Sequence, residues 1–137
     1  DTYTTGVFMQ NFSKKHAQLF TSLRQDSGDP LAFVDMAIRR YEELRVNPKL
    51  KYIVFSDSLD VEKAIQIKHY CGDRITATFG IGTNLMNDRG PEPLNVVIKM
   101  TQCNGQPVAK ISDSPEKSMC EDESYVRYLR QVFQHTL

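Results

Sequence analysis

The chain has 137 residues, of which 40% are hydrophobic and 25% charged, and these shares are those of a single globular domain with one core. Seventeen basic residues balance seventeen acidic ones without a basic stripe, so neither a nucleic acid nor an anionic membrane is expected as a partner. No apolar stretch is long enough to cross a bilayer, and the start carries neither Met nor a signal sequence, so we expect a piece of a longer cytoplasmic protein.

The first apolar runs predict a short helix and then a strand. Val7, Phe8 and Phe12 suggest the helix, and residues 19–23 form a compact apolar run. The polar residues 24–29 follow this run directly. A strand that leads into a polar turn is therefore expected here.

A second, clearer helix is predicted after this turn. Asp29 can cap it, and Pro30 suits the first helical position. It should end near Asn47, because a residue that precedes a proline avoids helical geometry. The apolar residues on one face of this helix are Phe33, Val34, Ala37, Ile38, Tyr41 and Leu44.

Two more strands and a third helix continue the alternation. Residues 52–55 and 75–79 are compact apolar strands. Between them, a helix begins near Asp60 and is stopped by Gly72. Its apolar residues are Val61, Ala64 and Ile65. These βα units predict an α/β fold with a parallel sheet and right-handed crossovers.

The pattern changes after Thr83. Residues 84–93 form a polar loop with two prolines and a glycine. Residues 94–103 and 106–112 are predicted to pair as a hairpin, because the intervening Asn-Gly pair suits the left-handed angles of a type I′ turn.

The C-terminal part contains helix signals. Residues 114–116 (SPE) resemble a helix start, and four apolar residues predict a last amphipathic helix. We therefore assign residues 1–91 to βα units, and residues 92–137 to a hairpin and helix packed on the same domain. The four apolar residues are Tyr125, Leu129, Val132 and Phe133.

The cysteines and histidines show no site pattern. Three cysteines without Cys-x-x-Cys spacing favour reduced, small buried residues in a cytosolic protein over a disulfide or zinc framework. The histidines fall in predicted helices or near the chain end, so surface roles are expected and none is placed as a general base. These residues are Cys71, Cys103, Cys120, His16, His69 and His135.

Three polar turns follow the three predicted strands, at residues 24–29, 56–60 and 80–83. In a parallel α/β sheet or barrel, such loops lie on one rim and gather catalytic and phosphate-binding groups. The sequence therefore predicts an active site formed by these turns, and a small ligand as its occupant.

The first turn carries both signs of charge. Arg24 offers a planar fork for a carboxylate or phosphate, while Asp26 and Asp29 could bind ribose hydroxyls or a magnesium shell. Asp29 precedes a proline and is more simply a helix cap. Arg24 and Asp26 come before it, so capping does not explain them.

In the second turn, Asp57 comes immediately after a strand. An acid there can accept two hydrogen bonds from ribose hydroxyls, whereas Asp60 more simply caps the third helix. An aspartyl phosphohydrolase would also place its nucleophile after an apolar strand. That activity and a non-catalytic nucleotide-binding α/β module stay open as alternatives.

The third turn contains two glycines that let the backbone approach an anion closely. Gly80 and Gly82 flank Ile81, and a helix that begins after Thr83 would direct N–H groups at a phosphate. A plain turn also explains this pattern on its own. After two acid-bearing turns, the phosphate interpretation is more specific.

Four segments together resemble bacterial nicotinate phosphoribosyltransferases. They are residues 23–30 (LRQDSGDP), 54–60 (VFSDSLD), 79–83 (FGIGT) and 93–99 (PLNVVIK), and the similarity continues through residues 103–115. It covers essentially the whole chain and corresponds to the C-terminal third or so of that enzyme. The fold it implies is a partial irregular (βα) barrel with parallel strands, followed by a β-hairpin and a C-terminal helix.

The resemblance also implies an activity with defined partners. The family makes nicotinate mononucleotide and pyrophosphate from nicotinate and phosphoribosyl pyrophosphate, with Mg²⁺, in the salvage route to NAD. ATP is a co-substrate whose hydrolysis assists the reaction. This chain would then be a fragment of a glycosyltransferase.

The resemblance implies roles for individual residues. Arg24 lies near the pyridine ring and its carboxylate, and Asp26 near the ribose and the magnesium pyrophosphate. Ser56 and Asp57 lie at the ribose, so that Asp26 and Asp57 are the catalytic candidates. The phosphate-binding loop comprises Gly80, Gly82 and Thr83, and Asp1 is assigned a supporting place in the site.

The chain departs from the family pattern in one respect. The histidine that is phosphorylated during ATP coupling, and the N-terminal domain that completes the site, have no counterpart in this stretch. We therefore expect the chain to be inactive without the missing N-terminal part. A cut barrel exposes strand edges and apolar faces, so self-association is also a potential property.

Overall fold

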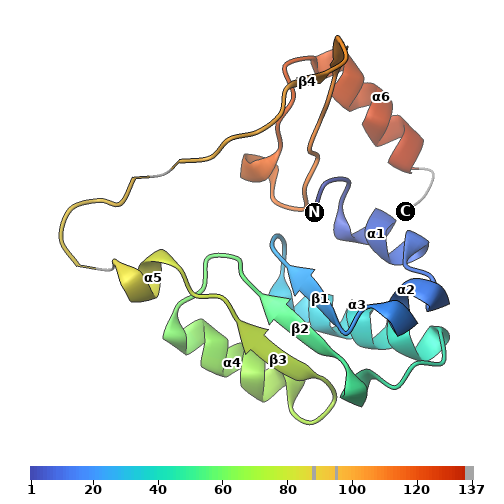
Figure 1. Ribbon diagram of the computed structural model, residues 1–137, viewed down its shortest axis with the longest axis vertical. Helices are drawn as coiled ribbons and strands as arrows, with labels where there is room; N and C mark the ends of the chain where they lie inside the picture. Colours follow the sequence, from blue (N-terminus) through green and yellow to red (C-terminus); the bar gives the residue numbers. More distant parts are fainter. Residues whose placement is uncertain (88, 95, 135–137) are drawn as a thin grey trace. The chain divides into compact units, whose positions relative to one another are not determined.

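The computed structural model describes residues 1–87, 89–94 and 96–134 and divides the chain into two compact units. The sheet unit comprises residues 12–94, and the terminal unit comprises residues 1–11 with the described residues from 96 to 134. Figure 1 is coloured along the sequence, so the terminal unit combines blue residues from the beginning of the chain with orange and red residues from its C-terminal part. Residues 1–11, which we assigned to the βα units from the sequence, thus group with the C-terminal residues.

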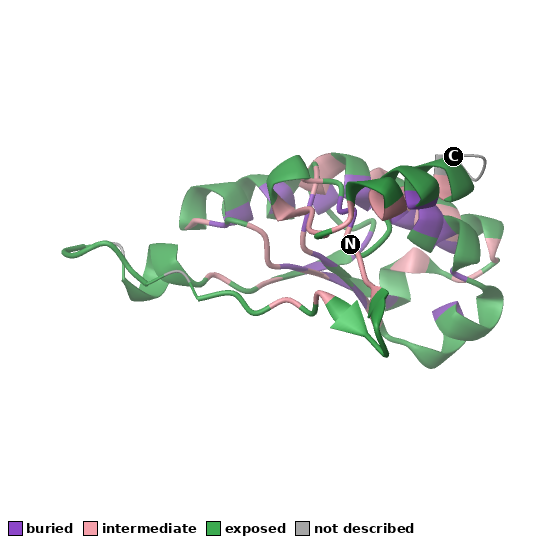
Figure 2. Cartoon of the chain, turned by 90° about the horizontal axis from the view of Figure 1, so that it is seen from above, coloured by how far each residue is buried: buried purple, intermediate pink, exposed green. Residues whose placement is uncertain are grey.

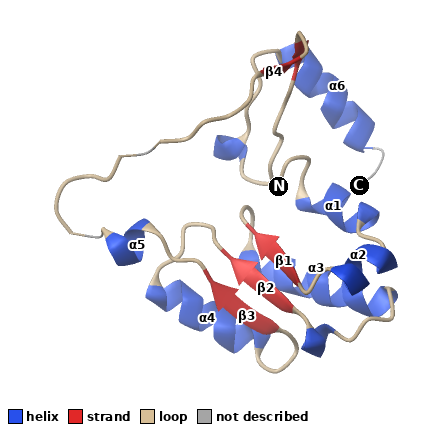
Figure 3. Cartoon of the chain, viewed as in Figure 1, coloured by secondary structure: helices blue, strands red, loops and turns tan. Residues whose placement is uncertain are grey.

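The sheet unit is built on three parallel strands in the order β1-β2-β3 (Figures 1 and 3). The strands are β1 (Ser22–Gln25), β2 (Tyr52–Phe55) and β3 (Thr76–Phe79). Gln25 lies opposite Phe55, which lies opposite Phe79, so the three strands end level. The predicted parallel sheet is confirmed.

The predicted strand over residues 19–23 is wrong at its beginning. Residues Lys14–Leu19 form the short helix α2, and β1 begins only at Ser22. Ser13 caps α2, because its Oγ accepts from the N–H of His16 (3.4 Å) and the His16 ring in turn bonds to the N–H of Ser13 (3.3 Å). This reciprocal capping stabilises a helix that is too short to show a clear apolar period.

Two longer helices connect the strands, and their caps are those predicted. In α3 (Pro30–Glu43), Asp29 Oδ1 accepts from the N–H of Leu31 (2.8 Å). In α4 (Val61–Cys71), Asp60 Oδ1 accepts from the N–H of Lys63 (2.7 Å), and Gly72 ends the helix with φ 56°. Both acids satisfy helix N–H groups that would otherwise lack partners.

The end of α3 differs slightly from the prediction. The helix stops at Glu43, and Asn47 caps a separate 3₁₀ turn, η1 (Pro48–Leu50), by accepting from the N–H of Lys49 (3.0 Å). The proline signal therefore marks a non-helical residue correctly, although the helix has already ended four residues earlier.

Helices α3 and α4 lie on one face of the sheet, where the core is found (Figures 1 and 2). Alternate strand residues, Leu23 and Gln25 in β1 and Ile53 and Phe55 in β2, are buried, whereas Arg24 between them is exposed. The helix residues buried with them are Phe33, Val34, Ala37, Tyr41, Ala64, Ile67 and Cys71. The period-2 pattern thus separates a core face from a face that carries Arg24.

Tyr41 of α3 offers a pH-dependent test of this core. It has no solvent exposure, its ring packs edge-on against Phe12 (centroids 5.8 Å apart), and its hydroxyl has no hydrogen-bond partner among the described residues. Burial raises the pKa of Tyr41 to about 12. Ionisation of this phenol is therefore less favourable in the folded chain than in the unfolded one.

The sign of the pH effect follows from this raised pKa. The contribution of Tyr41 is complete below the unfolded value near pH 10 and is lost as the pH rises toward about 12. We expect roughly 2–3 kcal/mol of unfolding free energy to disappear over this range, and Tyr41→Phe to abolish that loss. Urea unfolding of both proteins at several alkaline pH values measures it. A variant of the exposed Tyr128 serves as the control and should lose as much unfolding free energy as the parent. If Tyr41→Phe also lost as much over this pH range, the assignment would be contradicted.

The terminal unit joins the two ends of the chain through specific contacts. The carbonyl of Thr2 accepts from the N–H of Ile111 (2.7 Å), and the rings of Tyr3 and Phe133 lie 4.7 Å apart. Helix α1 (Thr5–Asn11) confirms the short first helix. Its first N–H, on Thr5, donates to Oδ2 of Asp113 (2.8 Å), so a carboxylate from the C-terminal part caps an N-terminal helix.

Removing this remote cap should loosen the terminal unit. We expect Asp113→Ala to lower the free energy of unfolding by about 1–2 kcal/mol, because the N–H and Oγ1 of Thr5 both lose their charged acceptor. Chemical denaturation and protease cleavage within residues 1–11 measure the effect. Asp73→Ala is a suitable control, since its side chain is 91% exposed and makes a surface ion pair with Lys49. Equal losses in the two variants would show that the cap contributes nothing specific.

The predicted hairpin forms with the predicted turn but is much shorter. Asn104 and Gly105 have φ values of 50° and 73°, as a type I′ turn requires. They join β4 (Gln102–Cys103) to β5 (Gln106–Pro107), which pair over two residues each. Strands over residues 94–103 and 106–112 are therefore wrong as predicted, and residue 95 lies outside the described residues. The apolar side chains of residues 96–98 are 65–93% exposed, and a two-stranded ribbon without a buried face is marginal in water.

The last helix is confirmed, and the start signal before it is not. Residues Pro115–Lys117 form only a 3₁₀ turn, η2, and α6 runs over Glu123–Gln134. Asp122 initiates this helix by accepting from the N–H of Ser124 (2.9 Å). A hydrogen bond from the Ser124 hydroxyl holds the pKa of Asp122 below its ordinary value.

The cysteines form no disulfide, as expected. Cys71 is buried, and burial raises the pKa of its thiol, whereas Cys103 is exposed and Cys120 is half-buried. The expectation of buried cysteines thus holds for Cys71 alone. Within residues 1–87, 89–94 and 96–134, no helix combines the length and apolarity needed to cross a bilayer.

Candidate functional site

The parallel sheet brings the three polar turns to one edge. Strands β1, β2 and β3 run in the same direction and end at Gln25, Phe55 and Phe79, which are paired in register. The turns at residues 26–29, 56–60 and 80–82 all leave the sheet from this edge (Figure 1). Carboxyl ends of parallel strands are where ligands bind in α/β folds.

Ser56 connects the first two turns. Its hydroxyl oxygen accepts from Nε of Arg24 (2.9 Å) and lies 3.2 Å from Oδ1 of Asp26 and 3.1 Å from the carbonyl of Gln25, either of which can accept its single proton. The Ser56 N–H also donates to the Gln25 carbonyl (3.0 Å). The structure therefore joins Arg24, Asp26 and Ser56 into one hydrogen-bonded group, which we call the rim cluster.

Within the rim cluster, Arg24 is oriented but remains accessible. Its Nη2 pairs with Oδ1 of Asp26 (3.3 Å), and its side chain is 66% exposed while that of Asp26 is 32% exposed. An exposed pair of this kind adds little stability. Its effect is geometric, because Ser56 and Asp26 fix the direction of a planar fork that can bind a carboxylate or phosphate.

Asp57 lies in the same turn as Ser56 and is half-buried. Its Oδ1 accepts from the hydroxyl of Ser58 (3.2 Å), a residue with φ 47°. Lys63 of α4 donates to the carbonyl of Ser58 (3.0 Å) and so ties this strained residue to the helix. The loop thus holds Asp57 at the strand end, next to the rim cluster in sequence.

The glycine turn is open, but Gly80 differs from its expected role. The N–H of Gly80 donates to the carbonyl of Phe55 (2.8 Å) and extends the ladder between β2 and β3, so this donor is already used. Gly82 caps α5 (Thr83–Met86), and nothing lies within 4 Å of the position that its Cβ would take. The predicted helix after the turn exists, although its single turn carries little dipole.

Two residues at this edge had no signal in the sequence. Asn84 of α5 donates from Nδ2 to the carbonyl of Leu59 (2.9 Å) and thereby connects the third turn to the second. Gln25 donates from its side chain to two carbonyls of the first turn. Amide side chains occur throughout loops and strands, so only the fold shows which backbone groups they reach.

The remaining predicted residues lie elsewhere. Asp1 belongs to the terminal unit, where Oδ1 accepts from the hydroxyl of Ser112 (2.6 Å) and Oδ2 pairs with Lys110. His16 and His69 are exposed, as expected, and His135 lies outside the described residues. Among the described residues, no three His, Cys, Asp or Glu side chains gather closely enough to hold a metal ion by themselves.

A second polar cluster lies between α3 and α4. Tyr70 donates to Oδ2 of Asp35 (2.6 Å), and Arg74 donates to Oδ1 of the same carboxylate (3.1 Å) and stacks over the Tyr70 ring. These bonds lower the pKa of Asp35, and the bond to Asp35 raises that of Tyr70. Tyr70 and Arg74 are exposed, Asp35 is half-buried, and the three groups satisfy one another, so we interpret the cluster as a clamp between the two helices.

Comparisons with known proteins identify the family of the chain. Residues 1–137 match the model of the Nicotinate phosphoribosyltransferase (NAPRTase) family. The nicotinate phosphoribosyltransferase of Burkholderia mallei is 50% identical over 133 residues, and that of Bordetella petrii is 49% identical over 134 residues. These alignments cover 97% and 98% of this chain but 33% and 34% of the relatives.

Solved structures give the same result. The nicotinate phosphoribosyltransferase of Porphyromonas gingivalis superimposes with a TM-score of 0.89 at 52% identity, and that of Vibrio cholerae with a TM-score of 0.91 at 40% identity. Each superposition covers 98% of this chain, and 36% and 34% of the respective structures. The chain therefore spans about a third of the length of the relatives it matches. Since the family model matches every residue, the chain belongs to the nicotinate phosphoribosyltransferase family.

Proposed function

We propose that the chain is the C-terminal third of an enzyme that forms nicotinate mononucleotide and pyrophosphate from nicotinate and phosphoribosyl pyrophosphate. The observation that carries this proposal is the rim cluster, in which Arg24, Asp26 and Ser56 meet at the carboxyl edge of the sheet in a member of this family. In this assignment the enzyme is a glycosyltransferase of NAD salvage.

The reaction is a displacement at the ribose anomeric carbon. The pyridine nitrogen forms a bond to that carbon as the bond to the pyrophosphate oxygen breaks, and positive charge builds on the ribose. We assign the fork of Arg24 to the nicotinate carboxylate, since its other donors are directed by Ser56 and Asp26. The carboxylates of Asp26 and Asp57 are assigned to the ribose, where their charge offsets the developing positive charge.

The residues at the rim also suit Mg²⁺. This ion usually binds one or two carboxylates and completes its shell with substrate phosphates and water, and Asp26 is one partly exposed carboxylate beside the assigned ribose position. When bound, the ion would neutralise charge on the leaving pyrophosphate. We assign the ribose 5-phosphate to the open turn at Gly82 and Thr83, with Gly80 shaping the turn through its bond to Phe55.

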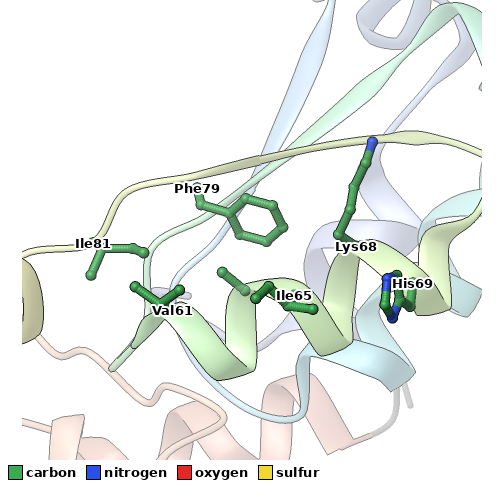
Figure 4. A pocket seen from close by; sticks show the side chains of 7 residues that line it. Val61, Ile65, Lys68, His69, Phe79 and Ile81 are labelled. Carbon is green, nitrogen blue, oxygen red and sulfur yellow. The ribbon is translucent and has the colours of Figure 1, made fainter.

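We further propose that the sheet unit is part of an irregular (βα) barrel. Among the described residues, β1 and β3 are both edge strands, and edges in a stable fold are normally paired or covered. Beside β3 lies a hollow of about 280 Å³, where Phe79 and Ile81 face Val61 and Ile65 of α4 (Figure 4). Val61 and Ile65 are about half exposed. This exposure suits a surface that further residues cover in a protein as long as the relatives, of which this chain spans about a third.

The other assignments rest on the resemblance and are proposals as well. ATP coupling is assigned to the part of the protein outside this chain, and Asp1 to a supporting role through its bonds to Ser112 and Lys110. A cytoplasmic location is supported by three cysteines without a disulfide.

The proposed function is tested with the full-length protein that contains this chain. Supplied with nicotinate, phosphoribosyl pyrophosphate, Mg²⁺ and ATP, it should release nicotinate mononucleotide, detectable by chromatography, and equimolar pyrophosphate. Replacing nicotinate by nicotinamide should reduce product strongly, because the amide cannot form a charge-assisted pair with Arg24. Phosphate release from phosphoribosyl pyrophosphate in the absence of ATP, without nicotinate mononucleotide, would instead support the phosphohydrolase alternative.

A further inference from the structure

Gln25 is buried at the end of β1, directly beside the rim cluster. Its side chain is on the helix-covered face, opposite to that of Arg24, and only 2% of the residue is exposed. Its amide nitrogen donates to the carbonyl of Ser27 (2.9 Å) and to that of Gly28 (3.1 Å). Since an amide nitrogen carries two hydrogens, both donors of the side chain are used within the first turn.

Burial of the Gln25 amide destabilises the fold unless its hydrogen bonds offset the cost. Oε1 of Gln25 is buried and has no hydrogen-bond partner among the described residues. A buried acceptor without a partner destabilises a fold, so an apolar side chain would be favoured here if packing alone mattered. The two donated bonds offset this cost, because they satisfy carbonyls of a turn in which Ser27 is itself buried and Gly28 is left-handed (φ 71°).

The bonds of Gln25 lie on both sides of Asp26. Its main-chain carbonyl accepts from the N–H of Ser56 (3.0 Å) and lies 3.1 Å from the Ser56 hydroxyl. Its side chain holds the two residues that follow Asp26. Asp26 therefore stands on a short segment that is held at both ends, whereas Arg24 precedes Gln25 in the strand and is held by Ser56.

We propose that Gln25 is a positioning residue that fixes the turn of residues 26–28 and thereby sets the place of the Asp26 carboxylate. This inference rests on the proposed function for its kinetic consequence. Loss of the amide donors lets the turn move, so contacts of Asp26 with the ribose and the magnesium pyrophosphate weaken. Nicotinate contacts through Arg24 weaken less, because the strand and the Nε bond to Ser56 still hold that side chain when its pair with Asp26 is loosened.

The test compares Gln25→Met, which keeps the volume but loses both donors, with Gln25→Asn, which keeps an amide of shorter reach. In the full-length protein, Gln25→Met should lower kcat/KM for phosphoribosyl pyrophosphate roughly tenfold to a hundredfold. The KM for nicotinate should rise by a clearly smaller factor, since the Nε bond of Arg24 to Ser56 remains. Gln25→Asn should show a smaller change in kcat/KM for phosphoribosyl pyrophosphate. Hydrogen exchange of the turn amides at residues 26–28 should accelerate in both variants.

Val34→Ala is the matched control, because Val34 is fully buried in α3 and is not part of the turn. It should lower the free energy of unfolding. The hydrogen exchange of residues 26–28 and the kinetic constants for both substrates should stay as in the parent. The positioning role would be wrong if folded Gln25 variants kept the parent's hydrogen exchange rates at residues 26–28. It would also be wrong if kcat/KM fell equally for both substrates. If the unmodified protein formed no nicotinate mononucleotide, the proposed function would fail instead, and accelerated exchange in Gln25→Met would still establish the hold on the turn.

Discussion

The 137-residue chain alone should form no nicotinate mononucleotide above background when it is given nicotinate, phosphoribosyl pyrophosphate, Mg²⁺ and ATP. The full-length protein should be active under the same conditions, so the expected difference exceeds roughly a thousandfold. Arg24 is 66% exposed and Asp26 32% exposed in this chain, and a site open to water loses much of its positional and electrostatic advantage. The chain also spans about a third of the length of its relatives.

This expectation needs a control for folding. Circular dichroism and a cooperative urea transition of the isolated chain would separate inactivity caused by an incomplete site from inactivity caused by unfolding. Adding the remaining part of the protein as a separate polypeptide should restore some activity if the two parts associate. A folded chain that turned over as fast as the full-length protein would place the whole chemistry in Arg24, Asp26 and Asp57.

Substitutions of Arg24 and Asp57 should affect different kinetic constants in the full-length protein. Arg24→Ala should raise the KM for nicotinate about tenfold to a hundredfold, because a charge-assisted hydrogen bond is worth roughly 1.5–3 kcal/mol. Asp57→Ala should mainly lower kcat by a similar factor, since its proposed contact with the ribose strengthens as charge develops. Steady-state kinetics with each substrate varied in turn measures both changes.

Two further variants sharpen this comparison. Arg24→Lys keeps the charge but loses the planar fork and the Nε bond to Ser56, so its defect should be nearly that of Arg24→Ala. Asp73→Ala removes a carboxylate that is 91% exposed and lies after α4, and it should leave both constants unchanged. Values within about twofold of the parent for the Arg24 and Asp57 variants would show that these residues are structural.

The signals that predicted structure correctly are local ones. Asp29 and Asp60 each bond to N–H groups two or three residues ahead, and Gly72 ends its helix through its own φ. The parallel strands over residues 52–55 and 76–79 follow from compact apolar runs alternating with helices. Because such interactions join residues close in sequence, the caps and the βα alternation can be read from the chain directly.

The extent of the hairpin could not be read in the same way. Asn104 and Gly105 determine the turn, which formed as predicted, but strand length depends on a surface against which the side chains pack. Within the described residues, Val96, Val97 and Ile98 have no such surface and stay exposed. Their β-branched pattern predicted a strand that this chain by itself does not form.

For the candidate site, the sequence by itself determined which residues stand at strand ends, because an apolar run followed by a polar turn marks such an end. It therefore identified Arg24, Asp26 and Asp57, whereas Ser56 was assigned through the family resemblance. Only the tertiary structure decided that Ser56 bonds to both Arg24 and Asp26, and that the Gly80 N–H is used by the sheet. These bonds join segments about 25 to 32 residues apart. Their geometry is set by the register between parallel strands, which are joined by long crossovers and not by a local turn.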